Sequence, residues 1–440
     1  MSQYVRTIAP ATLFLALLFA TPLFAASDHQ QTVLDELNAL KQRMAQLEQM
    51  LLNETTSPIS EEERSLQPQA EDTVTTATVV ENVVEAIRRH GPEFNGALRF
   101  GYCFNDFNDQ SKEKWGNADF NLFRLGVKGS YGKLSYNARY RWYRDYNFIE
   151  FGYLAYQVTN KTEAQLGISM VPFGIMPEAA NNFWYGIPYF TGYGTDYDLG
   201  LKILHKNGPW DLQLAFYKNE EMGSSSKLER YSYDVLTVSS NDLAANEETN
   251  QFNARLTYTF NHGDLGQTEL GISGQYGGLY NTITEDMGEH WAGAIHLNGN
   301  YGPWGLKLEV IEYDNNPENP KGVDDDIVYI GAFNDAYEVA AEGTIIVADL
   351  SYSIPVEWGP INNLKFYNDY SRLVKKESGF EDSQINTLGC MVTAGDIYAY
   401  FDVIMGNNAI YIGGKNNPFA AGEKDADWQT KFNINVGYYF

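Results

Sequence analysis

The chain has 440 residues, of which 44% are hydrophobic, and it carries a formal net charge of -26 with 31 tyrosines and two cysteines. This composition is too apolar for a disordered chain, and two cysteines are too few for a disulfide scaffold. The strong negative charge also argues against nucleic acid as a partner, because phosphate backbones are bound by Lys and Arg.

The first 26 residues have the pattern of a secretory signal peptide. Arg6 supplies a positive charge, an apolar run follows at residues 8–20, and Ala25 and Ala26 precede polar residues. The apolar run is shorter than the roughly 20 residues that a spanning helix needs. We therefore expect residues 1–26 to be a cleaved signal peptide, with a membrane anchor as the alternative.

Residues 27–52 are predicted to form a coiled coil. Apolar residues alternate at spacings of four and three, as in a heptad seam made of Val33, Leu37, Leu40, Met44, Leu47 and Leu51. An isolated helix of about 20 residues is marginal in water, which favours self-association over packing on its own domain. Residues 53–92, rich in Glu, Thr, Ser and Pro, are predicted to be a linker that contains a short amphipathic helix.

From residue 93 to residue 440 the apolar period changes to two. At the C-terminus, Ile434, Val436, Tyr438 and Phe440 share one parity, while Asn433 and Asn435 take the other. Alternation of this kind gives a strand one face for lipid and one for water. Strands of this kind can cross a membrane without an apolar run of 18 or more residues, and this region contains no such run.

Sixteen segments with this alternation follow one another, and their connections alternate between short and long. Seven short turns and eight longer loops place both ends of this region on the turn side. The pattern predicts an all-β fold, a 16-stranded antiparallel transmembrane β-barrel over residues 93–440. A soluble sandwich is the alternative, but it gives no reason for the alternation of connection lengths.

Three features together resemble a known family. The apolar C-terminal pattern at Val436, Tyr438 and Phe440 is similar to the assembly signal of bacterial outer-membrane barrels. Combined with the strand count, the heptads and Val171-Pro172-Phe173-Gly174, it resembles the trimeric porins of the phosphate-selective and dicarboxylate-selective group. The resemblance implies a homotrimer in the outer membrane, in contact with lipid and lipopolysaccharide, inserted by the barrel-assembly machinery, with the coiled coil in the periplasm.

The same resemblance implies that the third loop, at residues 171–197, folds inward and narrows the pore. The candidate constriction residues are Phe173, Glu178, Trp184, Tyr185 and Tyr189. The loop contains no Lys or Arg, which argues against selectivity for phosphate. Its aromatic residues either bury the loop against the wall or stack on the apolar faces of sugars.

Basic residues gather on the lumenal parity of the first three strands. They are Arg99, Arg124, Lys128, Arg139 and Arg141, and no acid of that parity interrupts them. A basic wall in a confined channel favours anions. The alternative is that these side chains pair with Glu150, Glu178 or loop acids and simply fill the lumen.

The sequence therefore predicts a passive diffusion channel for small hydrophilic solutes that leans to inorganic anions or carboxylates. A sugar channel and a non-transport anchor are the alternatives. We expect no enzymatic activity, because no residue is found that would orient His290 or His296 beside a nucleophile. No cofactor or metal site is expected either. The acidic sixth loop, at 312–344, matches no calcium-loop template and is expected to be a solvated surface.

Overall fold

The computed structural model describes residues 91–223, 226–238 and 245–440. The predicted signal peptide, the coiled coil with its seam from Val33 to Leu51, and the linker up to residue 90 lie outside the described residues. Those three expectations therefore remain predictions.

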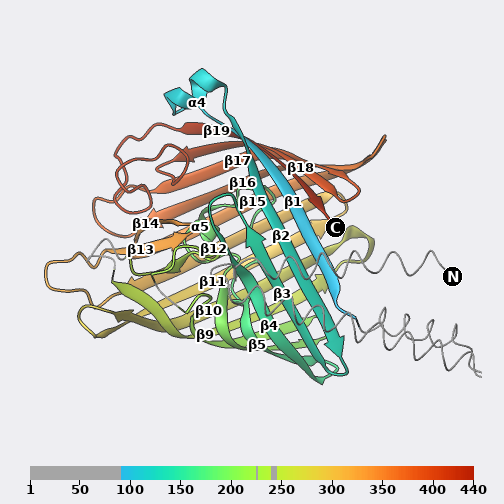
Figure 1. Cartoon of the computed structure of the whole chain (residues 1–440), viewed down its shortest axis with the longest axis horizontal. Helices are drawn as coiled ribbons and strands as arrows, with labels where there is room; N and C mark the ends of the chain where they lie inside the picture. The colour runs from blue at the N-terminus through green and yellow to red at the C-terminus, as the bar shows by residue number, and fades with distance from the viewer. Residues whose placement is uncertain (1–90, 224–225, 239–244) are drawn as a thin grey trace, which may run out of the picture. The chain divides into compact units, whose positions relative to one another are not determined.

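Sixteen strands form a closed barrel in which every neighbouring pair is antiparallel (Figure 1). The barrel closes where β1 pairs with β19, with Ala97 opposite Tyr439. The prediction of a 16-stranded antiparallel barrel is confirmed. The wall strands are β1 (Glu93–Asn105), β2 (Asn117–Tyr131), β3 (Leu134–Trp142), β4 (Asn147–Thr159), β5 (Thr162–Met170), β6 (Tyr197–Asn207), β7 (Trp210–Glu220), β9 (Asn246–Asn261), β10 (Gln267–Asn281), β11 (Met287–Tyr301), β12 (Trp304–Asn316), β15 (Glu342–Trp358), β16 (Ile361–Lys375), β17 (Ser383–Ala394), β18 (Ile397–Asn407) and β19 (Gln429–Tyr439).

The two ends of the barrel differ in the length of their connections. At the turn end, two-residue connections such as 132–133 begin with a glycine at positive φ, as Gly132 does at 59°. Glycine adopts this conformation without steric cost, which suits tight hairpins. The other end, here the loop end, carries the longer connections, which we name L1 (106–116), L2 (143–146), L3 (171–196), L4 (221–245), L6 (317–341) and L8 (408–428).

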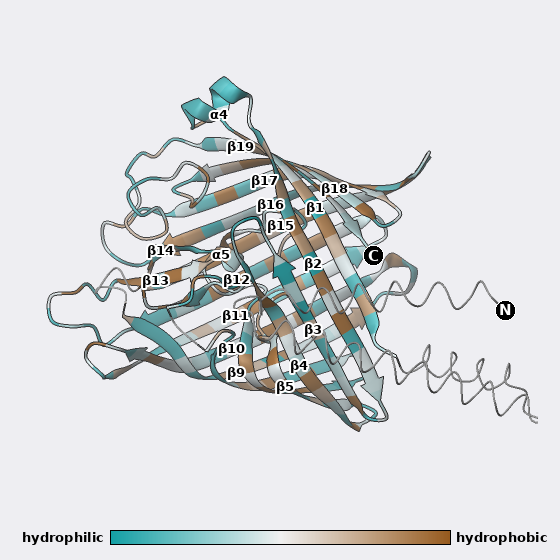
Figure 2. Cartoon of the chain, viewed as in Figure 1, coloured by the Kyte–Doolittle hydropathy of each residue, from teal (hydrophilic) through white to brown (hydrophobic). Residues whose placement is uncertain are grey.

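The outer surface of the wall is apolar, as expected for contact with lipid. Ile272 and Ile295 face each other across β10 and β11 and are 58% and 61% exposed. Hydrophobic and hydrophilic residues alternate along the strands (Figure 2). Near the turn end, Trp304 packs on Tyr352 with ring centroids 4.5 Å apart. Aromatic residues at this height are typical of the interfacial girdle of membrane barrels.

Several loops fold together at the loop end and form a second core. L4 and L6 contribute a three-stranded sheet of β8 (Asp234–Val235), β13 (Ile327–Ala332) and β14 (Asp335–Ala340). Val328, Ile330 and Val339 of this sheet are buried. The expectation that the sixth loop is a solvated surface is wrong for this hairpin, because its apolar residues find a partner in L4. Asp324, Asp325 and Asp326, which precede it, are exposed.

Two short helices belong to the loops, α4 (Asp109–Lys114) in L1 and α5 (Ile187–Phe190) in L3. Helix α4 projects beyond the rim, whereas α5 lies within the outline of the barrel and contacts β16 (Figure 1). In the described part of the chain, no helix is both long and apolar enough to cross a membrane.

Candidate functional site

L3 crosses the interior of the barrel and is bound to the wall far from its own ends. The backbone N–H of Ile175 donates to Glu309 Oε1 at 2.8 Å, and Arg255 Nε donates to the carbonyl of Gly174 at 2.7 Å. The N–H of Gly174 donates to Ser273 Oγ at 3.0 Å. Because β9, β10 and β12 supply these groups, the first half of L3 is held against the part of the wall that lies across the barrel from β19, β1 and β3.

Asp369 on β16 provides the second attachment of L3. Its carboxylate accepts hydrogen bonds from the backbone and side-chain nitrogens of Asn181 and Asn182 at 2.7–2.9 Å. Lys307 Nζ donates to the carbonyls of Glu178 and Ala180 at 3.0 and 2.7 Å. Charged side chains of this part of the wall therefore bind backbone atoms of L3. Hydrogen bonds in which one partner is ionised are stronger than hydrogen bonds between neutral groups.

The candidate constriction residues divide into two groups. Trp184, Tyr185 and Tyr189 line a cavity of about 390 Å³ at the loop end. Phe173 is instead buried beside Tyr193, with ring centroids 5.8 Å apart, where it packs L3 in place. Glu178 does not line the cavity, and the cations that act on its carboxylate are Lys307 and Lys365 rather than the basic patch.

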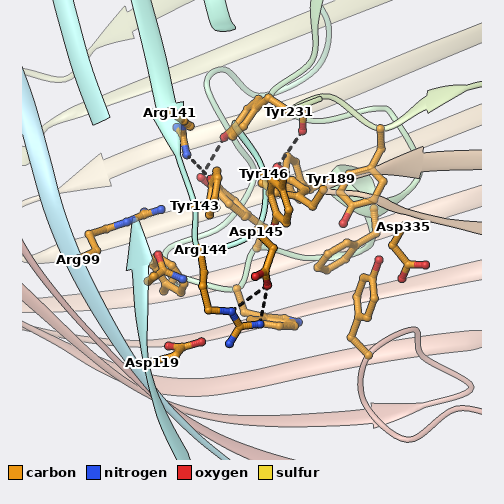
Figure 3. Close-up of a pocket in the computed structure, with 18 of the residues that line it drawn as sticks. Arg99, Asp119, Arg141, Tyr143, Arg144, Asp145, Tyr146, Tyr189, Tyr231 and Asp335 are labelled. Atoms are coloured by element: carbon orange, nitrogen blue, oxygen red, sulfur yellow. Dashed lines mark hydrogen bonds and ion pairs between the residues drawn. The ribbon is translucent and has the colours of Figure 1, made fainter. Parts of the chain in front are cut away.

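The cavity combines aromatic rings from several loops with charged groups of both the wall and the loops (Figure 3). Three arginines and three aspartates line it, and Arg144 pairs with Asp145 at 2.7 Å. Tyr189 packs on Tyr233 with ring centroids 5.2 Å apart, and its hydroxyl donates to the carbonyl of Tyr231. The charged lining residues are Arg99, Arg141, Arg144, Asp119, Asp145 and Asp335; the aromatic ones from loops other than L3 are Tyr143, Tyr146, Tyr231, Tyr233, Phe333 and Tyr411.

Part of the predicted basic patch is neutralised by one acid. Arg141 binds Glu150 through two hydrogen bonds of 2.6 and 2.5 Å, and Arg139 Nη1 lies 3.3 Å from the same carboxylate. The guanidinium of Arg141 also lies over the ring of Tyr231 at 4.3 Å. For Arg139 and Arg141 the structure therefore agrees with the alternative interpretation, in which Glu150 pairs with the arginines.

Other cations of the wall have no such partner. Within the described residues, Arg99 and Arg124 make no ion pair and instead lie over aromatic rings, those of Phe183 and Tyr439. Lys431 on β19 likewise lies 3.5 Å from the ring centroid of Trp184. A cation over a ring is attracted by the ring face, which carries no formal negative charge.

Four adjacent strands of the wall, β19, β1, β2 and β3, carry both the paired and the unpaired cations. We name these residues the basic track: Lys431, Arg99, Arg124, Lys128, Arg139 and Arg141. Arg124 lies opposite Arg141 in the register of β2 and β3. Lys128 lies nearer the turn end and pairs with Glu93 at 2.9 Å.

Neither the place of Lys431 in the basic track nor the aromatic lining residues of L2, L4, L6 and L8 were predicted from the sequence. The sequence showed that Lys431 has lumenal parity. That its strand, β19, lies beside β1 follows only from closure of the barrel. The apolar hairpin at 327–340 was the available signal that L6 packs inward.

Comparison with known proteins reveals likeness in structure alone. No protein-family model matches the chain, and no curated protein matches it in sequence. The anion-selective porin from Comamonas acidovorans has a TM-score of 0.50 at 12% identity, over 79% of this chain and 99% of that one. OmpF of Salmonella typhi, solved with daunomycin, has a TM-score of 0.50 at 11% identity, over 80% and 98%.

The outer-membrane channel DcaP of Acinetobacter baumannii is also similar, with a TM-score of 0.49 at 13% identity over 79% of this chain and 97% of that one. The likeness to the Comamonas and Salmonella proteins shows that the chain has the fold of the 16-stranded outer-membrane porins.

Proposed function

We propose that this protein is a passive outer-membrane channel for small hydrophilic solutes and that it favours anions, inorganic or carboxylate. The observation that carries the proposal is the unequal use of charge on the two sides of the lumen. Glu309 and Asp369 hold backbone N–H groups of L3, whereas Arg99 and Arg124 on the other side make no ion pair within the described residues. On the basic track, an anion would meet Arg99 and Arg124, which have no carboxylate partner among the described residues, whereas Arg139, Arg141 and Lys128 are paired.

A sugar channel is the second candidate, and the aromatic lining of the cavity favours it. Trp184, Tyr185 and Tyr189 of L3 face rings from other loops around the same cavity. Ring faces of this kind bind the apolar faces of saccharides. The basic track gives the anion channel the stronger support, because most of these tyrosines also pack against one another and so have a structural role.

The fold and the sequence resemblance support the proposed location and assembly. The apolar outer face and the aromatic residues near the turn end support insertion in the bacterial outer membrane. Val436 and Tyr438 of β19 and the terminal Phe440 are exposed on that outer face, where the barrel-assembly machinery would meet them. We infer a homotrimer whose coiled coil, residues 27–52, lies in the periplasm.

Solute competition in planar bilayers distinguishes the candidates. With the purified protein in KCl, citrate or succinate is expected to reduce the chloride current in the millimolar range, while maltose has little effect. Block by maltose without block by carboxylates would favour the sugar channel. Absence of any conductance in folded protein would favour a non-transport anchor.

A further inference from the structure

A cluster of buried carboxylates lies where L3 joins β6 and L4 passes beside it. Asp196 is the last residue of L3, Asp198 belongs to β6, and Asp234 belongs to β8. One carboxylate oxygen from each lies within 4.8 Å of one from each of the other two. The three residues are 8%, 2% and 1% exposed, respectively.

Each of these side chains has one oxygen without a partner. Asp198 Oδ2 accepts from Gln251 Nε2 at 3.2 Å, and Asp234 Oδ2 accepts from Arg230 Nη1 at 2.8 Å. The Oδ1 atoms of Asp196, Asp198 and Asp234 are buried without a hydrogen-bond partner among the described residues. Leaving a charged oxygen buried and unpaired is costly, so packing alone does not explain three of them together.

The surrounding charge does not balance the cluster. Glu221 is also buried there, and the ion pairs of the described residues bring one cation, Arg230, to this group of acids. Several buried carboxylates therefore share a single cation in these ion pairs, and a further cation would stabilise the group.

We propose that Asp196, Asp198 and Asp234 bind a hard divalent cation and that calcium is the ion that fits. The donors are carboxylate oxygens, with no His or Cys among them, which suits Ca²⁺ or Mg²⁺ rather than zinc or copper. Two oxygens bound to one Ca²⁺ at 2.3–2.6 Å lie at most about 5 Å apart, which agrees with the observed separations. Mg²⁺ usually retains several of its water ligands, whereas Ca²⁺ loses them more readily. A deeply buried site therefore favours Ca²⁺.

The site would join parts of the chain that line the candidate pathway. Asp234 lies next to Tyr233, which packs on Tyr189 of L3 and lines the cavity. β8 also pairs with β13 of L6, with Val235 opposite Ile330. A bound cation would therefore hold L4, and through it L6, against the end of L3. The sequence analysis expected no metal site because the spacing of the ligands does not reveal the contact between L3 and L4.

Thermal unfolding of the folded protein in detergent tests the proposal, with samples refolded in EDTA or in CaCl₂. Calcium is expected to raise the unfolding temperature of the wild type. Asp234→Asn is expected to lose this response. Asp324→Asn, the same change at an exposed acid of L6, should keep the full response; if Asp234→Asn does not fold, Asp196→Asn takes its place.

Terbium supplies a second readout that does not depend on stability. Tyr197 lies between Asp196 and Asp198 in the chain, so excitation of tyrosine is expected to sensitise bound Tb³⁺ in the wild type, with displacement by Ca²⁺. The proposal is overturned if wild-type stability is indifferent to calcium, or if Asp234→Asn and Asp196→Asn retain both the calcium response and the terbium signal. Displacement of Tb³⁺ by Mg²⁺ at equal concentration would overturn the assignment to calcium.

Discussion

In the proposed channel, Arg99 and Arg124 are expected to decide the sign of ion selectivity, because they make no ion pair within the described residues. One unit charge about 8 Å from a passing ion changes its energy by roughly 0.5 kcal/mol in water. We therefore expect Arg99→Gln or Arg124→Gln to lower the permeability ratio of chloride to potassium by about twofold or more. Reversal potentials in a salt gradient measure this ratio.

The control for this prediction is Lys128→Gln, since Lys128 is paired with Glu93 near the turn end and is half exposed to solvent. Its effect should be smaller than that of Arg99→Gln. Glu150→Gln should change the ratio in the opposite direction, because it leaves Arg139 and Arg141 without their shared carboxylate. If Lys128→Gln and Arg99→Gln change the permeability ratio equally, unpaired Arg99 does not have the special role in selectivity that we propose.

The odd or even position of a residue in its strand was the sequence feature that best predicted which side chains face the lumen. It placed Arg99, Arg124, Arg139 and Arg141 on the lumenal face, because a strand alternates its faces whatever it pairs with. It did not reveal that Glu150 reaches both Arg139 and Arg141, since that contact depends on the register of β3 and β4, including the irregularity between Arg139 and Tyr140.

At the scale of elements, L3 depends on a few charged side chains of the opposite wall. Asp369→Ala removes the acceptor of four hydrogen bonds from Asn181 and Asn182. Hydrogen bonds to a charged group each contribute about 1.5–3 kcal/mol, so L3 should loosen. We expect single channels with larger conductance and more current noise than the wild type.

Glu163→Ala is the matched control for L3, because it removes a lumenal carboxylate that binds Gln165 on its own strand. Its current noise should remain at the wild-type level. An unchanged conductance trace for Asp369→Ala would mean that L3 does not narrow the pathway.

The lipid face of the wall gives an independent test of strand assignment. Ile295→Arg places a charge on an exposed position of β11 and should destabilise the barrel by roughly 2–4 kcal/mol if the residue lies near mid-bilayer. Ile283 is an exposed isoleucine in the connection between β10 and β11, so Ile283→Arg should lower the free energy of unfolding only slightly. Urea titration of barrels folded in lipid vesicles compares the two; equal costs would mean that Ile295 does not face lipid.

The barrel strands could be predicted because each carries its own alternation and each connection its own turn signal. The loop end could not be predicted in the same way. The burial of Tyr231 and Tyr337 depends on contacts between L3, L4, L6 and L8, which lie far apart in the chain. Such contacts leave no periodic pattern, and the acidic residues of L6 suggested solvent where an apolar hairpin folds inward.

At the scale of the whole molecule, assembly as a trimer rests on the resemblance and on the predicted coiled coil. Deletion of residues 27–57 is expected to leave the barrel folded, because β1 begins at Glu93, while lowering the temperature at which trimers dissociate in detergent. Mobility in semi-denaturing gels after stepwise heating measures this. An equally heat-resistant trimer would mean that the coil does not assist assembly and that contact with the cell wall explains it better.

We propose that the molecule is an open diffusion channel that favours anions along the basic track. The zero-current potential of the wild-type protein in a tenfold KCl gradient across a planar bilayer is the decisive measurement. We expect conductance with a reversal potential of the sign set by chloride, reduced in Arg99→Gln. A potential of the sign set by potassium, or no conductance from folded protein, would show that the proposed channel function is wrong.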